Sequence, residues 1–195
     1  MKNFSGGGEP GIADYVERVF EPEDAVLREI RERSRREGLP EIQLGPMDAL
    51  HLEVLVRAAG AKKAVEIGTL GGYSGTAIVR GLAPGGRLHT FEIDLRHAAV
   101  ARESFQRAGV LDRVTIHVGV ALEKLPEIES QGPFDVVFLD ADKESYPAYL
   151  EWAARHLRVG GLAIGDNAFA WGEIAKGSDA AHKALRAFNQ EIARG

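Results

Sequence analysis

Two groups of oxygen-bearing side chains follow short apolar segments in the second half of the chain. Asp140 comes directly after the apolar run 134–139, and Asp166 and Asn167 follow a second run, 161–164. An Asp-Asn pair on its own is typical of a turn. If the two runs are neighbouring strands, however, the three side chains converge as hard oxygen ligands, a set that suits Mg²⁺ or Mn²⁺. The combination therefore predicts a divalent cation site.

Lys143 belongs to the same ionisable cluster as Asp140. A neighbouring cation and desolvation both favour the neutral form of an amine, which makes Lys143 a candidate general base. The alternative interpretation is a plain ion pair with Glu144 or Asp142. The residues alone leave both interpretations open.

A glycine-rich segment follows the earlier apolar run 64–67. Its sequence is G-x-x-G-G-x-x-G, which begins at Gly68 and leads into a predicted helix. Glycine permits a left-handed backbone and close approach of a ligand, and a helix N-terminus favours a carboxylate or a phosphate. The spacing is not the G-x-G-x-x-G of dinucleotide binders, and Glu66 would repel a pyrophosphate. We expect a cofactor with an ammonium group, the alternative being a tight turn that binds nothing.

The next predicted strand, 87–93, also ends in acidic residues. Glu92 lies about 20 residues beyond the glycine loop, where a carboxylate can accept hydrogen bonds from both hydroxyls of a ribose. Asp94 has the position of a cap for the following helix. Glu92 is therefore the candidate ribose ligand.

A parallel sheet would bring these residues together. Apolar runs alternate with amphipathic segments after Lys63, which is typical of parallel strands joined by helices. The expected strands are 64–67, 87–93, 114–118, 134–139 and 161–164. The expected helices are 74–81, 95–108, 121–125, 145–157 and 179–192, after two that begin near Pro22 and Pro46. The pattern predicts one α/β, doubly wound Rossmann-like domain, 1–195, with an N-terminal helical region, 1–60, and a core, 61–195.

The composition narrows the range of partners. The 195 residues are 45% hydrophobic and carry a formal net charge of −5, so they offer no general attraction to nucleic acid or anionic lipid. The chain has no cysteine, so any metal must be bound by oxygen or histidine. No segment has the length of apolar sequence that a membrane span requires. We expect a cytoplasmic protein with no nucleic-acid or membrane partner.

Several longer motifs carry a resemblance over about 42–172. They are V-E-I-G-T-L-G-G-Y-S-G, F-E-I-D, R-V-T-I-H-V-G-V-A-L-E, F-D-V-V-F-L-D-A-D-K-E-S-Y and V-G-G-L-A-I-G-D-N. Together they resemble the cation-dependent O-methyltransferases of the catechol and caffeoyl-coenzyme A type. The resemblance implies an S-adenosylmethionine-dependent class I methyltransferase that methylates a hydroxyl of a small, catechol-like aromatic acceptor with the help of a divalent cation, most often Mg²⁺.

The resemblance also implies roles for individual residues. Those implied to hold the amino-acid end of S-adenosylmethionine are Glu66, Gly68, Thr69 and Ser74, with a backbone contact from Leu44. Glu92 would bind the ribose, and the backbone of Ala121 the adenine. The implied metal ligands are Asp140, Asp166 and Asn167, with Asp140 also facing the acceptor and Lys143 as the base.

Two departures from the family pattern stand out. Ala49 replaces a glycine that is common in the family, which adds a methyl group to the packing of the entrance helix. The family also continues into two further strands that form an antiparallel edge, for which this sequence has no counterpart. We expect either a truncation or a homodimer that covers the open edge, because an unpaired edge strand invites pairing.

Three alternatives remain at the level of sequence. A cation-independent methyltransferase would use the glycine loop and Glu92 without a metal site. A non-catalytic S-adenosylmethionine-binding protein would bind without turnover. A nicotinamide oxidoreductase shares the architecture but requires a different glycine spacing.

Overall fold

The computed structural model describes residues 10–194. The beginning of the predicted helical region 1–60 and the last residue of the domain therefore lie outside the described residues. Within them, no helix is both long enough and apolar enough to cross a membrane.

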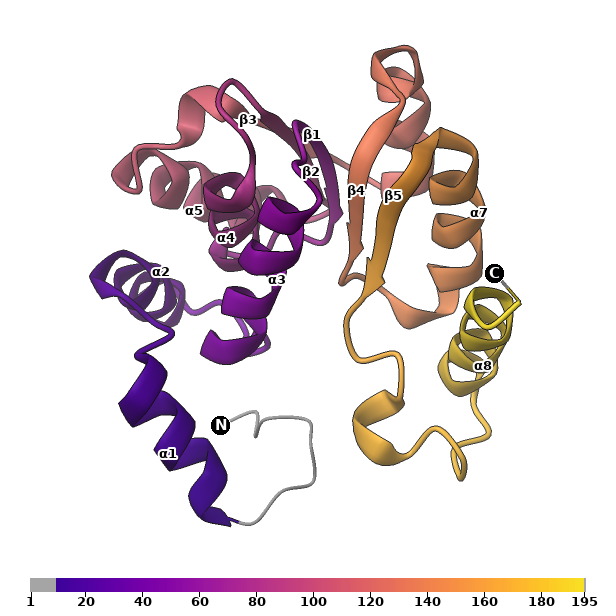
Figure 1. Ribbon diagram of the computed structural model, residues 1–195, viewed down its shortest axis with the longest axis horizontal. Helices are drawn as coiled ribbons and strands as arrows, with labels where there is room; N and C mark the ends of the chain where they lie inside the picture. The colour runs from indigo at the N-terminus through magenta and orange to yellow at the C-terminus, as the bar shows by residue number, and fades with distance from the viewer. Residues whose placement is uncertain (1–9, 195) are drawn as a thin grey trace.

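A five-stranded parallel sheet forms the centre of the molecule (Figure 1). The strands are β1 (Lys63–Ile67), β2 (Arg87–Glu92), β3 (Val114–Val118), β4 (Phe134–Leu139) and β5 (Leu157–Gly165). Their order is β3-β2-β1-β4-β5. Strands β2 and β3 are added on one side of β1, and β4 and β5 on the other, so the strand order reverses between β1 and β4. This is the doubly wound topology that the sequence predicts, and a ligand is expected outside the strand ends at this point.

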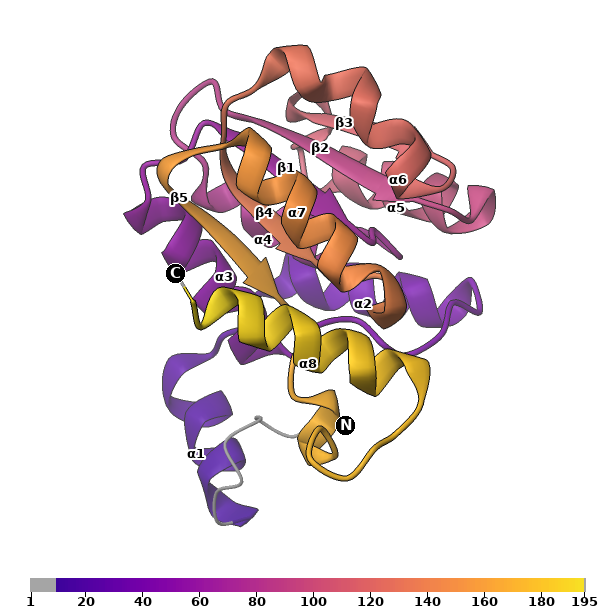
Figure 2. The same ribbon diagram turned by 90° about the vertical axis from the view of Figure 1, so that its right-hand side faces the viewer.

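Helices cover both faces of the sheet (Figure 2). One face packs against α2 (Ala25–Arg36), α3 (Pro46–Ala58) and α4 (Tyr73–Gly81), with α5 (Leu95–Arg107) beside them. The other face packs against α6 (Ala121–Lys124), α7 (Tyr146–His156) and α8 (Ala180–Ile192). Short 3₁₀ turns are η1 (Leu111–Arg113), η2 (Leu125–Gln131), η3 (Lys143–Ser145) and η4 (Ala170–Gly172).

The alternation of side chains along the central strands creates two hydrophobic cores. Val137 and Leu139 of β4 belong to the core under α7 and α8, whereas Val136 and Phe138 belong to the core under α3 and α4. All four are at most 2% exposed. A strand buried on both faces is apolar throughout, which explains the continuous hydrophobic run in the sequence.

The edge strand β5 is longer than the sequence indicates, because it begins at Leu157 instead of 161. A register shift in its pairing with β4, between Phe134 and Val136, allows the extra residues to join. Arg158 anchors this start through an ion pair with Asp135 of 2.6 Å. Within residues 10–194 the sheet contains no antiparallel strand, and the far side of β5 has no strand partner.

The N-terminal helices differ most from the prediction. The helix expected near Pro22 begins at Ala25, where the Asp24 carboxylate accepts a hydrogen bond from the Leu27 amide. An additional helix, α1 (Pro10–Phe20), precedes it and projects from the body of the protein in both views (Figures 1 and 2). It was not predicted, although Ile12, Val16 and Val19 recur along it at helical spacing.

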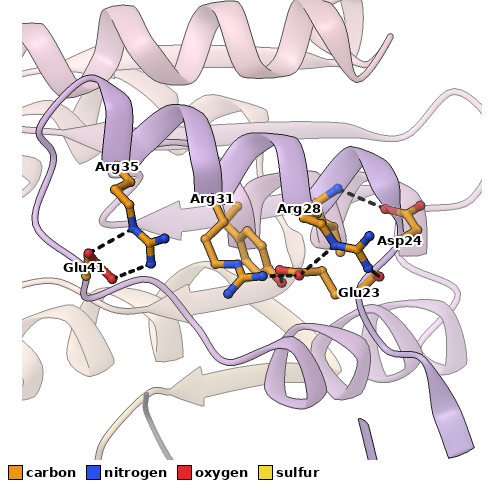
Figure 3. A network of polar contacts seen from close by, with 8 residues as sticks. Glu23, Asp24, Arg28, Arg31, Arg35 and Glu41 are labelled. Atoms are coloured by element: carbon orange, nitrogen blue, oxygen red, sulfur yellow. Dashed lines mark hydrogen bonds and ion pairs between the residues drawn. The ribbon is translucent and has the colours of Figure 1, made fainter. Parts of the chain in front are cut away.

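Charged residues along α2 connect it to the preceding turn and the following loop (Figure 3). Arg31 pairs with Glu23 at 2.5 Å, and Arg35 makes a two-pronged contact with Glu41. Asp24 also pairs with Arg80 at the end of α4. The arginine-rich face of α2 is therefore partly engaged in fixing the helix to the core.

Candidate active site

A cavity of about 720 Å³ opens at the carboxyl ends of β1, β2 and β4. Its lining includes nine of the predicted site residues: Leu44, Gly68, Thr69, Ser74, Glu92, Ala121, Asp140, Lys143 and Asn167. Two predicted residues, Glu66 and Asp166, are next to the cavity in sequence but do not line it. The fold thus gathers the glycine loop and the Asp140 cluster around one space.

The glycine loop is held in shape by its neighbours. Gly68 has a φ of 101°, and a methyl group there would overlap the carbonyl oxygen of Asp140. Only glycine permits this close approach of the first loop to the end of β4. Leu70 also has a left-handed backbone, with a φ of 49°.

Glu92 stabilises the strained part of this loop. Its carboxylate accepts hydrogen bonds from the Leu70 amide at 2.7 Å and from the Thr69 amide at 3.3 Å. Its other oxygen accepts from the Asp94 amide at 3.0 Å and lies 3.6 Å from the His97 ring. Asp94 caps α5 as the sequence indicates, accepting from the Arg96 and His97 amides. Glu92 therefore supports the loop in addition to facing the cavity.

Glu66 is fully buried beneath the loop. Its two oxygens accept hydrogen bonds of 2.6 Å from Ser74 and from Thr90. Burial, reinforced by the negative charges of Asp140 and Glu92, raises the pKa of Glu66 to about 8 despite these two hydrogen bonds. At neutral pH this shift favours the protonated form of the Glu66 carboxyl group.

Lys143 forms the centre of the second cluster. Its ammonium group lies 3.1 Å from an Asp140 carboxylate oxygen, 2.5 Å from the Tyr146 hydroxyl and 3.2 Å from the Asp166 carbonyl oxygen. The ion pair suggested by the sequence exists, but its partner is Asp140 and not Glu144 or Asp142. Asp142 instead accepts a hydrogen bond from the Tyr149 hydroxyl.

The ends of β4 and β5 lie side by side, as the metal-site prediction requires. The Asp166 amide donates to the Leu139 carbonyl at 2.9 Å, next to Asp140. Asn167 has a left-handed φ of 55° and donates its side-chain amide to the Asp166 carboxylate. Among the described residues, no group of three histidine, cysteine or acidic side chains has metal-binding geometry.

The donor set nevertheless fits a hard cation. It combines two carboxylates with one amide, all of which supply the oxygen atoms that Mg²⁺ prefers. A cation, the Lys143 ammonium, already lies against Asp140. The carboxylate of Asp140 is therefore already positioned to pair with a positively charged group.

Several residues at the site were not recognised from the sequence. Tyr146 was assigned only to the apolar face of its helix, yet its hydroxyl contacts the Leu139 and Asp166 carbonyl oxygens and Lys143. Its position three residues after Lys143, across the junction of η3 and α7, was the available signal. His97 was given no role but lines the cavity. Trp171, which follows Asp166 and Asn167 in the sequence and was for that reason a candidate wall of the acceptor pocket, lines the cavity and is 68% exposed, so it is not part of the core.

Comparison with known proteins identifies the family. The O-methyltransferase family matches residues 17–195. The chain belongs to this family. Enzymes of this family depend on S-adenosylmethionine, so the protein is an S-adenosylmethionine-dependent O-methyltransferase.

Individual relatives agree with the family assignment. The chain is 41% identical over 170 residues to a catechol O-methyltransferase of Mycobacterium tuberculosis, covering 87% of this chain and 77% of the relative. It is 30% identical over 165 residues to caffeoyl-CoA O-methyltransferase 1 of Eucalyptus globulus, covering 83% and 67%. The structure of an O-methyltransferase from Bacillus cereus in complex with SAH superposes with a TM-score of 0.88 at 40% identity, covering 93% and 84%. The sequence relatives and the structural neighbour therefore agree on both the fold and the reaction class, which is O-methyl transfer.

Proposed function

We propose that this O-methyltransferase transfers the methyl group of S-adenosylmethionine to one hydroxyl of a catechol-like aromatic acceptor, assisted by a divalent cation such as Mg²⁺. The observation that supports this proposal best is the single cavity that joins the glycine loop and Glu92 to Asp140, Lys143 and Asn167. A methyl donor and a cation-held acceptor require such adjacent sites.

The cofactor occupies the half of the cavity formed by the glycine loop. Its amino-acid end lies against Gly68, Thr69 and Ser74, with Leu44 as a further backbone contact. The ribose hydroxyls contact Glu92, and the adenine lies beside Ala121. Four carboxylates, those of Glu92, Asp94, Asp140 and Asp142, line the cavity, and this negative charge suits a sulfonium cofactor.

The acceptor occupies the half of the cavity near Trp171 and Tyr149. Asp140, Asp166 and Asn167 would hold the cation, with the side-chain hydrogen bond between Asn167 and Asp166 given up for it. A bound cation would supply Lewis-acid chemistry that favours loss of a proton from a hydroxyl of the diphenol.

The protein contributes mainly position and proton transfer. For this the Lys143 ammonium first loses a proton to solvent, and the neutral amine, released from its ion pair with Asp140, then accepts the proton of the acceptor hydroxyl at Nζ. The acceptor oxygen then attacks the methyl carbon in line with the departing sulfur, so a C–O bond forms as the C–S bond breaks. Because a sulfonium is a good leaving group, alignment of the two reactants provides most of the acceleration.

A turnover assay tests the proposal. The protein is incubated with S-adenosylmethionine and a panel of catechols, and methyl ethers are detected by mass. We expect products that disappear with a chelator and return with added Mg²⁺. Asp140→Ala should abolish this turnover while leaving cofactor affinity largely unchanged. Products that persist in chelator would show a cation-independent enzyme, and cofactor binding without any methyl ether would indicate a binding protein.

A further inference from the structure

A second, smaller cavity lies between α2 and α5. Its volume is about 180 Å³, and it shares no lining residue with the active-site cavity. Much of its wall is apolar, formed by Ala25, Val26, Ile30 and Ala108. A space of this size holds a small organic molecule and is not explained by methyl transfer.

Two buried polar groups that line this cavity lack hydrogen-bond partners among the described residues. Ser104 is 1% exposed, and its hydroxyl is unpaired. Arg33 is 7% exposed, and its Nε–H is also unpaired, although its terminal nitrogens contact Glu103 and Glu29. Buried donors are normally satisfied, so two that line one cavity indicate a missing acceptor.

The charge around the cavity indicates what that acceptor is. Glu29 also lines the cavity, but its carboxylate pairs with Arg33 and Arg36, and Glu103 is a second partner of Arg33. Arg107 also lines the cavity, is exposed, and has no ion pair within the part of the chain that the structure describes. One unpaired guanidinium beside two hydrogen-bond donors is a suitable environment for a carboxylate.

We propose that the α2–α5 cavity binds a small carboxylate with an apolar body. The carboxylate accepts from Ser104 and from Arg33 Nε, pairs with Arg107, and places its hydrocarbon part against Val26 and Ile30. A single water molecule would satisfy the two donors but would leave the apolar wall without a partner.

The cavity is connected to the cofactor loop through the residues that follow its two donors. Ser34, next to Arg33, packs so closely on Gly71 that a methyl group there would overlap the serine hydroxyl. Phe105, next to Ser104, packs on Gly72 and Gly75 in the same way. A ligand that fixes α2 against α5 therefore also fixes the loop, and we expect it to tighten cofactor binding. This second part of the proposal rests on the proposed cofactor site.

Calorimetric titration with benzoate tests the site itself. We expect benzoate to bind the wild-type protein, and the neutral isostere benzamide and the short acetate to bind more weakly. Ser104→Ala and Arg107→Gln should each weaken benzoate binding by about tenfold. Arg102→Gln is the matched control, because Arg102 is exposed on the same helix but does not line the cavity. Absence of benzoate binding, or equal losses in Arg107→Gln and Arg102→Gln, would overturn the proposal and leave water as the occupant.

A second titration tests the connection to the cofactor. With saturating benzoate, the Kd for S-adenosylhomocysteine should fall about threefold, and the cofactor should tighten benzoate binding by the same factor. The Arg107→Gln protein should lose this effect while binding the cofactor as the wild type does. Benzoate binding without any change in cofactor affinity would remove the coupling but not the site. A protein that binds benzoate but no cofactor would instead contradict the proposed function.

Discussion

The hydroxyl group of Tyr73 lies 2.9 Å from a carboxylate oxygen of Glu23. Tyr73 is the first residue of α4, directly after the glycine loop, and lines the active-site cavity, whereas Glu23 belongs to the turn between α1 and α2. The other Glu23 oxygen binds Arg31, so one carboxylate joins two helices. Figure 3 shows the Glu23 side chain beneath α2, facing Arg31 and Arg28. The N-terminal region is thereby fixed to the cofactor loop.

We predict that Tyr73→Phe lowers the free energy of unfolding by about 1–2 kcal/mol, because a buried hydrogen bond to a charged group is lost. Glu23→Ala should cost more, because it also removes the ion pairs with Arg31 and Arg28, and the double variant should lose less than the sum, since both single changes remove the Tyr73–Glu23 hydrogen bond. Urea unfolding provides the measurement. Tyr15→Phe, at an exposed position of α1, is the control and should be neutral. Strict additivity in the double variant would show that the contact contributes nothing.

The raised pKa of Glu66 predicts a pH-dependent stability. Between its ordinary value of 4.5 and about 8, the folded protein keeps a proton on Glu66 that the unfolded chain releases. The free energy of unfolding should therefore fall as the pH rises through this range, by at most about 1.4 kcal/mol per pH unit from this group. Below pH 4.5 the stabilisation from the Glu66 proton is fully present, and above about pH 8 the titration of Glu66 lowers the free energy of unfolding no further.

Glu66→Gln isolates this effect from other titrations, because glutamine cannot ionise. We expect the difference in unfolding free energy between wild type and Glu66→Gln to shift in favour of the variant from about pH 5 to about pH 8. Urea unfolding of both proteins across this range gives the answer. A constant difference would mean that Glu66 has the same pKa in the folded and unfolded states.

The sequence predicted the sheet and the positions of its strand ends because both depend on local patterns. The run 134–139 is apolar since β4 is buried on both faces, and Asp140 begins where that burial ends. The same reasoning brought Asp166 and Asn167 next to Asp140, because parallel strands share one carboxyl edge. The cavity residues were thus predictable wherever they directly follow a strand.

The partners of individual side chains were not predictable, because they depend on how distant segments pack. Lys143 was a candidate base, with an ion pair to Glu144 or Asp142 as the alternative, and the fold of η3 places its ammonium group against Asp140 and the end of β5 instead. Glu66 was expected to face a ligand, yet its strand position places it under the loop between Ser74 and Thr90. Neither outcome has a signal in local spacing.

The contact between Gly68 and Asp140 predicts a steric penalty. Gly68→Ala would force an alanine into a φ of 101° and place its methyl group on the Asp140 carbonyl oxygen. We expect a loss of about 3 kcal/mol or more, measured by thermal or urea unfolding. Gly85→Ala separates the two causes, because Gly85 also has a positive φ, of 76°, but open space around it. Its loss should be only about 1–2 kcal/mol. Equal losses at both positions would show that the strand contact is not limiting.

The surroundings of Lys143 allow its role as a base to be separated from its role as a positive charge. Its ammonium group already contacts Asp140, Tyr146 and the Asp166 carbonyl oxygen, so a permanent cation of similar length could preserve much of the cluster. Lys143→Arg keeps the charge but cannot accept a proton at physiological pH. If Lys143 is the base, kcat should fall by about 100-fold or more while the Kd for S-adenosylhomocysteine stays within about twofold. Lys183→Arg, on α8 and outside the cavity, is the control. Near-normal turnover of Lys143→Arg would mean that Lys143 acts only by balancing the charge of Asp140.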